Sequence, residues 1–298
     1  MSADRRQPLR IAAGRLLHAC GAYRQLLPVY APRRGRLRQR LLDYLQHYLQ
    51  SVPSAEADLY LEPLGAWFAC DLNDHMLAPY LQGEAPIYEL AEIRFWQQQV
   101  RSGDQLLDIG ANHGFWGVTL ATSTAVGQLH LFEANPAIAA RLRRTLSLNR
   151  GLPATLHACA VSDGSVDRIC FYRPQGNLSG LGSTVLHAYA AAHGYLNADD
   201  RIEVPASSID QLVQRGAIGG IDLVKIDVEQ AEDAVVAGAR EAFARFQPRM
   251  LMVETGARSQ ATETLRQLGY QVTLLQPDGR ERALRDEDWG NLVFRRTA

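Results

Sequence analysis

The chain has 298 residues, enough to bury a substantial core in one large domain or in a domain with an appendage. Its composition, 47% hydrophobic and 21% charged, is that of an ordinary soluble globular protein, and a formal net charge of -1 gives no overall argument for binding nucleic acid. No apolar run reaches the roughly 20 residues of a membrane span, the N-terminus lacks a secretory signal pattern, and the four cysteines form no CxxC pair. We therefore expect a cytoplasmic protein with reduced thiols.

The N-terminal part, residues 1–85, is predicted to be a basic, mainly helical extension that ends in a hairpin. Its first forty residues contain ten arginines and a single acid, Asp4, and leucines recur at helical spacing over residues 37–49. Residues 59–84 read as short strands and turns, with Gly65 near the middle of a hairpin. One interpretation is a solvated helical face that caps the main domain or forms a homodimer; the other is a surface for an acidic partner, an anionic membrane or a phosphorylated substrate.

Strands and helices alternate through residues 86–298, after a helical pattern at 87–100. Alternation on this scale is typical of a doubly wound α/β fold. Residues 173–200 form a long glycine-containing loop, which we expect to be a lid or a substrate loop. Strands are expected at 105–110, 127–134, 154–161, 166–173, 220–229, 248–255, 270–276 and 291–296, with helices at 114–123, 137–149, 231–246 and 260–269.

The glycine-containing turn "DIGANHG" follows the first of these strands. No GxxxxGK[ST] motif is present, so a triphosphate loop is excluded. In the dinucleotide motif GxGxxG a second glycine admits the pyrophosphate, but Asn112 stands there between Gly110 and Gly114. The turn is better suited to a small zwitterion, because Asp108 could accept from an ammonium while the backbone amides face a carboxylate.

The next two strand ends supply groups suited to an adenosine. Glu133 lies 23 residues after Gly110, where an acid can accept from both ribose hydroxyls, although enzymes that use NAD share this feature and a plain surface acid is the alternative. The third strand ends in "ACAVSD", where Ala160 and Val161 could flank an adenine ring and Asp163 could accept from its amino group. Three strand ends suited to one ligand favour an adenosyl compound.

Six motifs give the chain a specific resemblance. "DIGANHG", "FEANP", "ACAVSD", "SSIDQL", "IDLVKIDVEQAEDAVVAGA" and "RMLMVETG" occur in the order seen in FkbM-type S-adenosylmethionine-dependent methyltransferases, over about residues 87–295. The resemblance implies a Rossmann-like seven-stranded methyltransferase sheet with the last strand antiparallel. It also implies S-adenosylmethionine as cofactor, S-adenosylhomocysteine as product, and O-methylation of a sugar, glycan precursor or polyketide-like metabolite. Relatives often have a pair like Tyr88 and Glu89, which we expect to contact the methionine end of the cofactor.

One position departs from the family pattern. Relatives usually read "KIDVEG", whereas this chain has Gln230 in place of that glycine. The glutamine could narrow the pocket, bond the substrate, or mark lost activity. The alternative function is therefore a catalytically silent module that binds cofactor or glycan; an NAD-dependent oxidoreductase is disfavoured by Asn112.

Three charged residues at the "KIDVE" strand end are the catalytic candidates. An alcohol needs help to lose its proton, and we expect Asp227 to act as base or to orient the hydroxyl, supported by Lys225 and Glu229. Lys225 is the only lysine among 31 basic residues, which suggests that its compact ammonium matters, although a structural ion pair with Asp227 is the simpler alternative. A less favoured hypothesis has Asp227, Glu229 and Glu254 binding magnesium.

The remaining substrate-binding candidates lie in loops. His113 lies within the glycine turn, and Asn177 and Ser179 belong to the polar stretch "QGNLSGLGST". Gln230 and Glu254 face the same expected crevice. Capping or packing is the alternative for His113, and a flexible linker is the alternative for the polar stretch.

Overall fold

The computed structural model describes residues 56–296 except 83, 175, 177 and 187, so the basic N-terminal arm lies outside the described residues. The described part opens with an antiparallel hairpin of β1 (Glu56–Leu61) and β2 (Ala66–Asp71), followed by α4 (Ala78–Gln82). Gly65 lies in the hairpin turn with a φ of 66°. The hairpin expected between residues 59 and 84 is therefore present.

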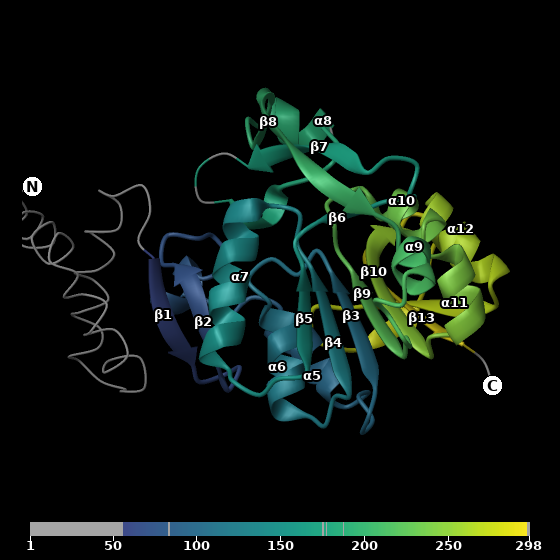
Figure 1. The fold of residues 1–298 in the computed structure, drawn as a ribbon, viewed down its shortest axis with the longest axis horizontal. Coiled ribbons are helices and arrows are strands. Elements are labelled where there is room, and N and C mark those ends of the chain that lie inside the picture. Colours follow the sequence, from purple (N-terminus) through teal and green to yellow (C-terminus); the bar gives the residue numbers. More distant parts are fainter. Residues whose placement is uncertain (1–55, 83, 175, 177, 187, 297–298) are drawn as a thin grey trace, which may run out of the picture.

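The centre of the fold is an eight-stranded sheet in the order β12-β11-β13-β10-β9-β3-β4-β5 (Figure 1). Without the edge strand β12, and numbered along the chain, its order is 3-2-1-4-5-7-6, with β13 antiparallel to both of its neighbours. The seven-stranded methyltransferase sheet with an antiparallel last strand is thus confirmed. The strands are β3 (Gln105–Ile109), β4 (Gln128–Phe132), β5 (Ala154–His157), β9 (Leu223–Ile226), β10 (Met250–Gly256), β11 (Tyr270–Leu275), β12 (Glu281–Ala283) and β13 (Trp289–Arg296).

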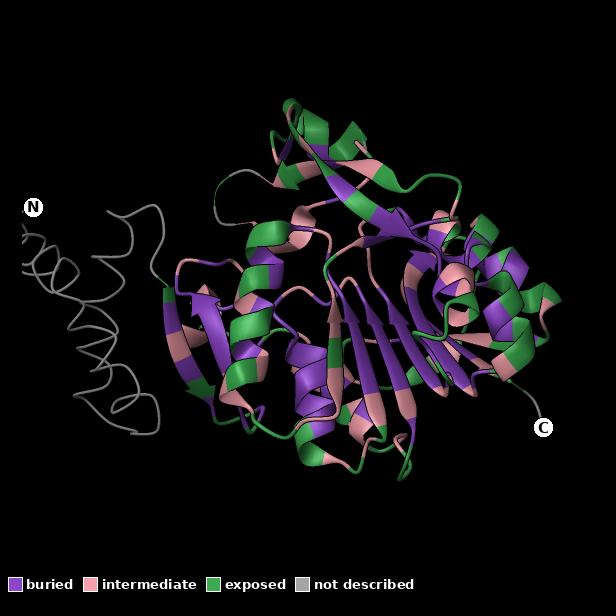
Figure 2. Cartoon of the chain, in the orientation of Figure 1, coloured by how far each residue is buried: buried purple, intermediate pink, exposed green. Residues whose placement is uncertain are grey.

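Helices cover both faces of this sheet, because alternate residues of each central strand point to opposite sides and both sides are apolar. Leu106 packs in the core on one face and Leu107 in the core on the other, so the central strands are buried along almost their whole length (Figure 2). One face is covered by the hairpin with α5 (Leu90–Gln97), α6 (Phe115–Ser123) and α7 (Pro136–Leu148). The other is covered by α9 (Ile209–Gln214), α10 (Glu232–Ala237), α11 (Arg240–Phe246) and α12 (Gln260–Gln267).

The start of α7 illustrates how local sequence fixes an element. Asn135 is the N-cap, and its side-chain oxygen accepts from the backbone N–H of Ala137 at 3.1 Å. Pro136 occupies the first helical position, where its missing N–H costs nothing. Because the helix begins so soon after β4, the position of Glu133 between the two elements is fixed.

The region between β5 and α9 differs from the sequence expectation. The single strand expected at 154–161 divides, and β6 (Ala160–Val161) joins a separate sheet with β7 (Arg168–Pro174) and β8 (Leu196–Ser207). The expected loop at 173–200 contains the short helices η1 (Ser179–Leu181) and α8 (Ala188–Ala192), and its last residues already belong to β8. Much of β8 is polar and exposed on both sides, so it lacks the hydrophobic alternation that reveals a strand.

Candidate functional site

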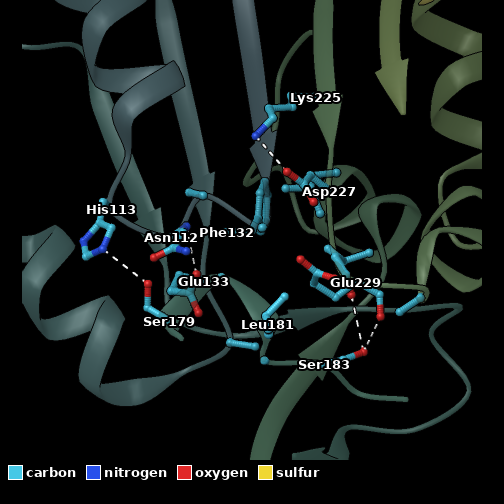
Figure 3. Close-up of a pocket in the computed structure, with 18 of the residues that line it drawn as sticks. Asn112, His113, Phe132, Glu133, Ser179, Leu181, Ser183, Lys225, Asp227 and Glu229 are labelled. Atoms are coloured by element: carbon cyan, nitrogen blue, oxygen red, sulfur yellow. Dashed lines mark hydrogen bonds and ion pairs between the residues drawn. The ribbon is translucent and has the colours of Figure 1, made fainter. Parts of the chain in front are cut away.

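A cavity opens at the carboxyl ends of β3, β4 and β9, the edge where ligands bind in open α/β sheets (Figure 3). It encloses about 990 Å³ of space between atoms, including its open mouth. Residues 179–184 cover it, and residues 75–76 and 88–89 line its sides. The turn after β3, the end of β4 and the turn after β9 therefore meet in one place.

The turn after β3 needs glycine for a reason within the protein. Gly110 has a φ of 85°, and a Cβ atom there would lie 1.8 Å from the carbonyl oxygen of Asp227. The two turns thus touch through their backbones. Asn112 also has a positive φ, 48°, and its side-chain Oδ1 is buried without a partner among the described residues. The turn presents an unsatisfied acceptor beside the cavity.

Glu133 is held rigidly at the end of β4. One carboxylate oxygen accepts from the backbone N–H of Asn112 at 2.9 Å, and the other accepts from the N–H of Asn135 at 2.7 Å. Burial raises the pKa of Glu133 to about 7, against the lowering effect of these two bonds. Each oxygen keeps a lone pair, so the carboxylate can accept two further hydrogen bonds from a diol in the cavity.

Asp108 lies beneath the turn and does not line the cavity. Its Oδ2 accepts from the backbone N–H of Gly117 at 3.1 Å, and its Oδ1 is buried without a partner among the described residues. Burial raises the pKa of this carboxyl to about 7. The structure places Asp108 as a support for the start of α6.

Lys225 stands at the centre of a buried charge cluster. Its Nζ donates to Glu89 Oε1 at 2.8 Å and to Asp227 Oδ2 at 3.0 Å, and the residue is only 4% exposed. Burial opposes the charge, but the two carboxylates hold the pKa of Lys225 above its ordinary value. The structure thus shows the ion pair with Asp227 and adds Glu89 as a second partner.

Two further carboxyl groups adjoin Asp227. Burial together with the Asp227 carboxylate raises the pKa of Glu254 to about 10. Glu254 therefore stays protonated and donates a hydrogen bond to Asp227. Burial would raise the pKa of Asp227, but Lys225 and this bond keep it below its ordinary value. Glu229 lines the cavity beside Asp227 and, through burial and its acidic neighbours, has a pKa raised to about 8.

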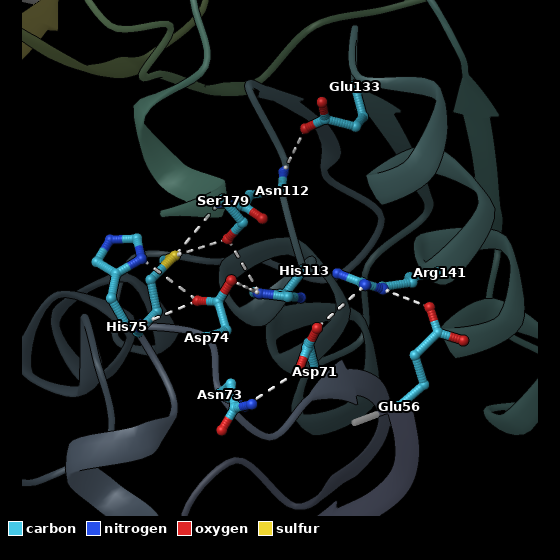
Figure 4. A network of polar contacts seen from close by, with 11 residues as sticks. Glu56, Asp71, Asn73, Asp74, His75, Asn112, His113, Glu133, Arg141 and Ser179 are labelled. Carbon is cyan, nitrogen blue, oxygen red and sulfur yellow. Dashed lines mark hydrogen bonds and ion pairs between the residues drawn. The ribbon is translucent and has the colours of Figure 1, made fainter. Parts of the chain in front are cut away.

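A second polar network lies at the opposite side of the cavity (Figure 4). The Nε2 of His113 is 3.4 Å from Asp74 Oδ2 and 3.3 Å from Ser179 Oγ, so it bridges the hairpin side of the molecule and the covering segment. His113 is buried, and its Nδ1 has no partner among the described residues. Asp74 was not among the predicted site residues, because nothing in "DLNDHM" distinguishes it from an ordinary turn acid.

The structure brings most predicted site residues together but not all. Gln230 and Asp163 are exposed outside the cavity, Asp163 accepting from Ser165, and Gly114 begins α6 behind the cavity wall. Glu254 lies behind Asp227, and Asn177 lies outside the described residues. The predicted residues that line the cavity are Tyr88, Glu89, Gly110, Asn112, His113, Glu133, Ala160, Val161, Ser179, Lys225, Asp227 and Glu229.

The family model of the methyltransferase FkbM domain matches residues 108–272, more than half of the chain. The chain belongs to the FkbM methyltransferase family. The matched segment runs from the end of β3 into β11. It contains the turn after β3, the end of β4 and the turn after β9, but not residues 75–76 and 88–89 at the sides of the cavity. The resemblance seen in the motifs is therefore confirmed.

Two curated proteins are similar to this FkbM-family chain. The 31-O-demethyl-FK506 methyltransferase FkbM of Streptomyces tacrolimicus is 29% identical over 168 residues, 48% of this chain and 62% of that protein. The 2-O-methyltransferase NoeI of Sinorhizobium fredii is 29% identical over 148 residues, 47% of this chain and 59% of that protein. The matches thus span about three-fifths of the length of these relatives.

Solved structures also align with this chain. A methyltransferase FkbM from Methylobacillus flagellatus aligns with a TM-score of 0.43 at 13% identity, over 95% of this chain and 60% of that one. TYW2 of M. jannaschii, solved in complex with AdoMet, aligns with a TM-score of 0.43 at 14% identity, over 81% of this chain and 87% of that one.

None of the helices in the described part of the chain has both the length and the apolar character that a membrane-spanning helix needs.

Proposed function

We propose that this chain is an S-adenosylmethionine-dependent O-methyltransferase that acts on a hydroxyl of a sugar, a glycan precursor or a polyketide-like metabolite. The observation that carries the proposal is the position of Glu133. Its carboxylate lines the cavity and is held there by two backbone N–H groups, and each oxygen still has a lone pair that can accept from a ribose diol. Membership of the FkbM family and the names of the two curated relatives, both O-methyltransferases, support the same chemistry.

The residues of the cavity fit the proposed cofactor. When bound, S-adenosylmethionine supplies a methyl group on a sulfonium. The buried and unpartnered Oδ1 of Asn112 is an acceptor for the ammonium of its amino-acid end. Ala160 and Val161 are buried apolar residues at the cavity wall and suit the faces of an adenine. Tyr88 and Glu89 line the cavity, and Glu89 accepts a hydrogen bond from Lys225.

Asp227 is proposed to orient the acceptor hydroxyl. Its carboxylate is held by a hydrogen bond from Lys225 at 3.0 Å and by a second hydrogen bond from protonated Glu254. A carboxylate held in this way accepts a hydrogen bond in a defined direction, and alignment is most of what methyl transfer requires. Asp227→Asn is expected to lower kcat by about 10²-fold or more; full activity of this variant would remove Asp227 from the mechanism.

The first experiment is calorimetric titration of the purified protein with S-adenosylhomocysteine, with NAD as the control ligand. We expect micromolar binding of S-adenosylhomocysteine, weakened in Glu133→Ala, and no binding of NAD. Transfer of labelled methyl groups to a panel of neutral hydroxylated acceptors then tests the reaction. Binding of neither ligand would favour the silent binding module instead.

Magnesium is tested in the same assay. Among the described residues no group of three histidine, cysteine or acidic side chains is arranged to hold a metal ion. Asp227 already bonds Lys225 and Glu254, which leaves it poorly placed to join Glu229 around a cation. We expect exhaustive chelation to leave methyl transfer unchanged, and a loss restored by magnesium would revive the metal hypothesis.

A further inference from the structure

The turn after β9 contains two consecutive non-glycine residues in the left-handed region. Glu229 has a φ of 56° and Gln230 a φ of 74°. L-residues with side chains disfavour this region, and strained conformations persist at functional sites only where the surroundings hold them. The strain here therefore requires contacts that fix the turn.

Contacts hold the turn from two sides. From within the next helix, Glu232 Oε1 accepts from the backbone N–H of Val228 at 3.0 Å and of Gln230 at 3.2 Å. From the segment that covers the cavity, Ser183 Oγ donates to the carbonyl oxygen of Glu229 at 2.6 Å. Ser183 is 1% exposed and is separated from Glu229 by 46 residues, so this contact depends on the tertiary fold.

The turn directs the Glu229 side chain into the cavity, on the Asp227 side and across from Glu133 (Figure 3). Asp227 is already engaged by Lys225 and Glu254, whereas the carboxylate of Glu229 has no hydrogen-bond or ion-pair partner among the described residues. Among the acids of the turn, Glu229 is therefore the one free to accept a proton from a ligand.

We infer that Glu229 takes the proton of the acceptor hydroxyl during methyl transfer and that Ser183 positions Glu229 for this role; the inference rests on the proposed function. The hydroxyl oxygen forms a bond to the methyl carbon, the carbon–sulfur bond breaks with its electron pair left on sulfur, and the hydroxyl proton passes to the Glu229 carboxylate. Burial raises the pKa of Glu229 to about 8, which makes its carboxylate a stronger base than an ordinary glutamate. Asp227 keeps the orienting role.

The test uses two cofactor analogues, so it does not require the acceptor to be known. Sinefungin carries an amine in the position of the transferred methyl group, and S-adenosylhomocysteine carries nothing there. Near Glu229 the protonated amine gains a charge interaction. We expect wild-type protein at pH 8.5 to bind sinefungin about tenfold more tightly than S-adenosylhomocysteine, the size of a single moderate charge interaction. This preference should shrink at pH 6.5, where Glu229 holds a proton.

The variants separate the roles. Glu229→Gln should lose at least about fivefold of the sinefungin preference and its pH dependence, while its affinity for S-adenosylhomocysteine stays the same. Ser183→Ala should reduce the preference in the same direction and Ser183→Thr should restore it, whereas a merely structural role would weaken both ligands equally. The exposed Glu263→Gln is the matched control and should change nothing.

Two outcomes would overturn the inference. A preference and pH dependence preserved in Glu229→Gln would show that another group faces the methyl position. Thermal unfolding of each variant identifies loss of the fold, and the isosteric Glu229→Gln decides the question even if Ser183→Ala does not fold. Wild-type protein that binds neither analogue would instead mean that the proposed function itself is wrong, and the inference would fall with it.

Discussion

Glu133 shows how one buried carboxyl group makes ligand binding depend on pH. Only its ionised form can accept from both hydroxyls of a ribose, and burial raises its pKa to about 7. We therefore predict that the affinity for S-adenosylhomocysteine weakens as the pH falls from 8.5 to 6, measured by calorimetry at constant ionic strength. Glu133→Gln should bind at least about tenfold more weakly, because hydrogen bonds to a charged group are lost. An equally steep pH dependence in Glu133→Gln would assign the effect to another group.

Gly110 and Gly65 offer a matched pair of glycines with positive φ. A Cβ atom at Gly110 would lie 1.8 Å from the carbonyl oxygen of Asp227, whereas one at Gly65 meets nothing within 4 Å. Gly65→Ala is therefore predicted to cost about 1 kcal/mol, from the backbone conformation alone. Gly110→Ala should cost at least about 4 kcal/mol or prevent folding. Urea unfolding measures both, and equal losses would contradict the contact between the two turns.

At the scale of elements, the turn from β9 to α10 has a strained backbone that hydrogen bonds with Ser183 and Glu232 hold in place. Gln230, with a φ of 74°, stands where the family pattern has glycine, and its side chain is exposed. Gln230→Gly should raise the free energy of unfolding by about 0.5–1 kcal/mol, because relief of the backbone strain exceeds the extra entropy of glycine in the unfolded chain.

The control for this substitution is Gln214→Gly, at the exposed end of α9. There the backbone is helical, so glycine should lower the free energy of unfolding by up to about 1 kcal/mol. Opposite signs for the two substitutions are the expected result in urea unfolding. A loss at both positions would show that the Gln230 side chain makes contacts that outweigh its strain.

For the whole molecule, five carboxyl groups with raised pKa values make stability depend on pH. Each has a folded-state pKa above its value of about 4 to 4.5 in the unfolded chain, so its contribution to stability is lost as the pH rises from the unfolded value through the folded value. The unfolding temperature should therefore fall by at least about 5 °C between pH 6.5 and 9, followed by circular dichroism. The groups are Glu92, Asp108, Glu133 and Glu232, with pKa values of about 7, and Glu229, with a pKa of about 8.

Two buried histidines partly offset this trend below pH 6.5. Burial lowers the pKa of His130 to about 4 and also lowers that of His157, whose Nε2 lies 3.1 Å from His130 Nδ1. A histidine kept neutral in the folded state loses its contribution as the pH falls below its unfolded value of about 6.5. Glu229→Gln should make the loss of stability shallower between about pH 4.5 and 8, where only the folded state holds the Glu229 proton. A stability that rises steadily from pH 6.5 to 9 would contradict the burial of the acids.

The sequence determined the class of fold and the places where the site residues would stand. Hydrophobic periodicity is a property of neighbouring residues, so the apolar strand 220–229 and the cap at Asn135 could be recognised from local pattern alone. Since parallel strands end at one edge, Gly110, Glu133 and Asp227 could also be expected to meet. The polar strand β8 escaped this reasoning because pairing with β7, rather than its own pattern, makes it a strand.

Only the tertiary structure decided which groups touch. Lys225 meets Glu89, 136 residues away, and Ser183 reaches Glu229 from the segment that covers the cavity. Asp74 joins His113, and Asp163 lies outside the cavity although its strand end was expected to supply a ligand contact. Such contacts, and the pKa shifts that follow from them, depend on how far water is excluded by segments remote in the chain. Local pattern places a residue at the end of an element, whereas packing determines its partner and its charge.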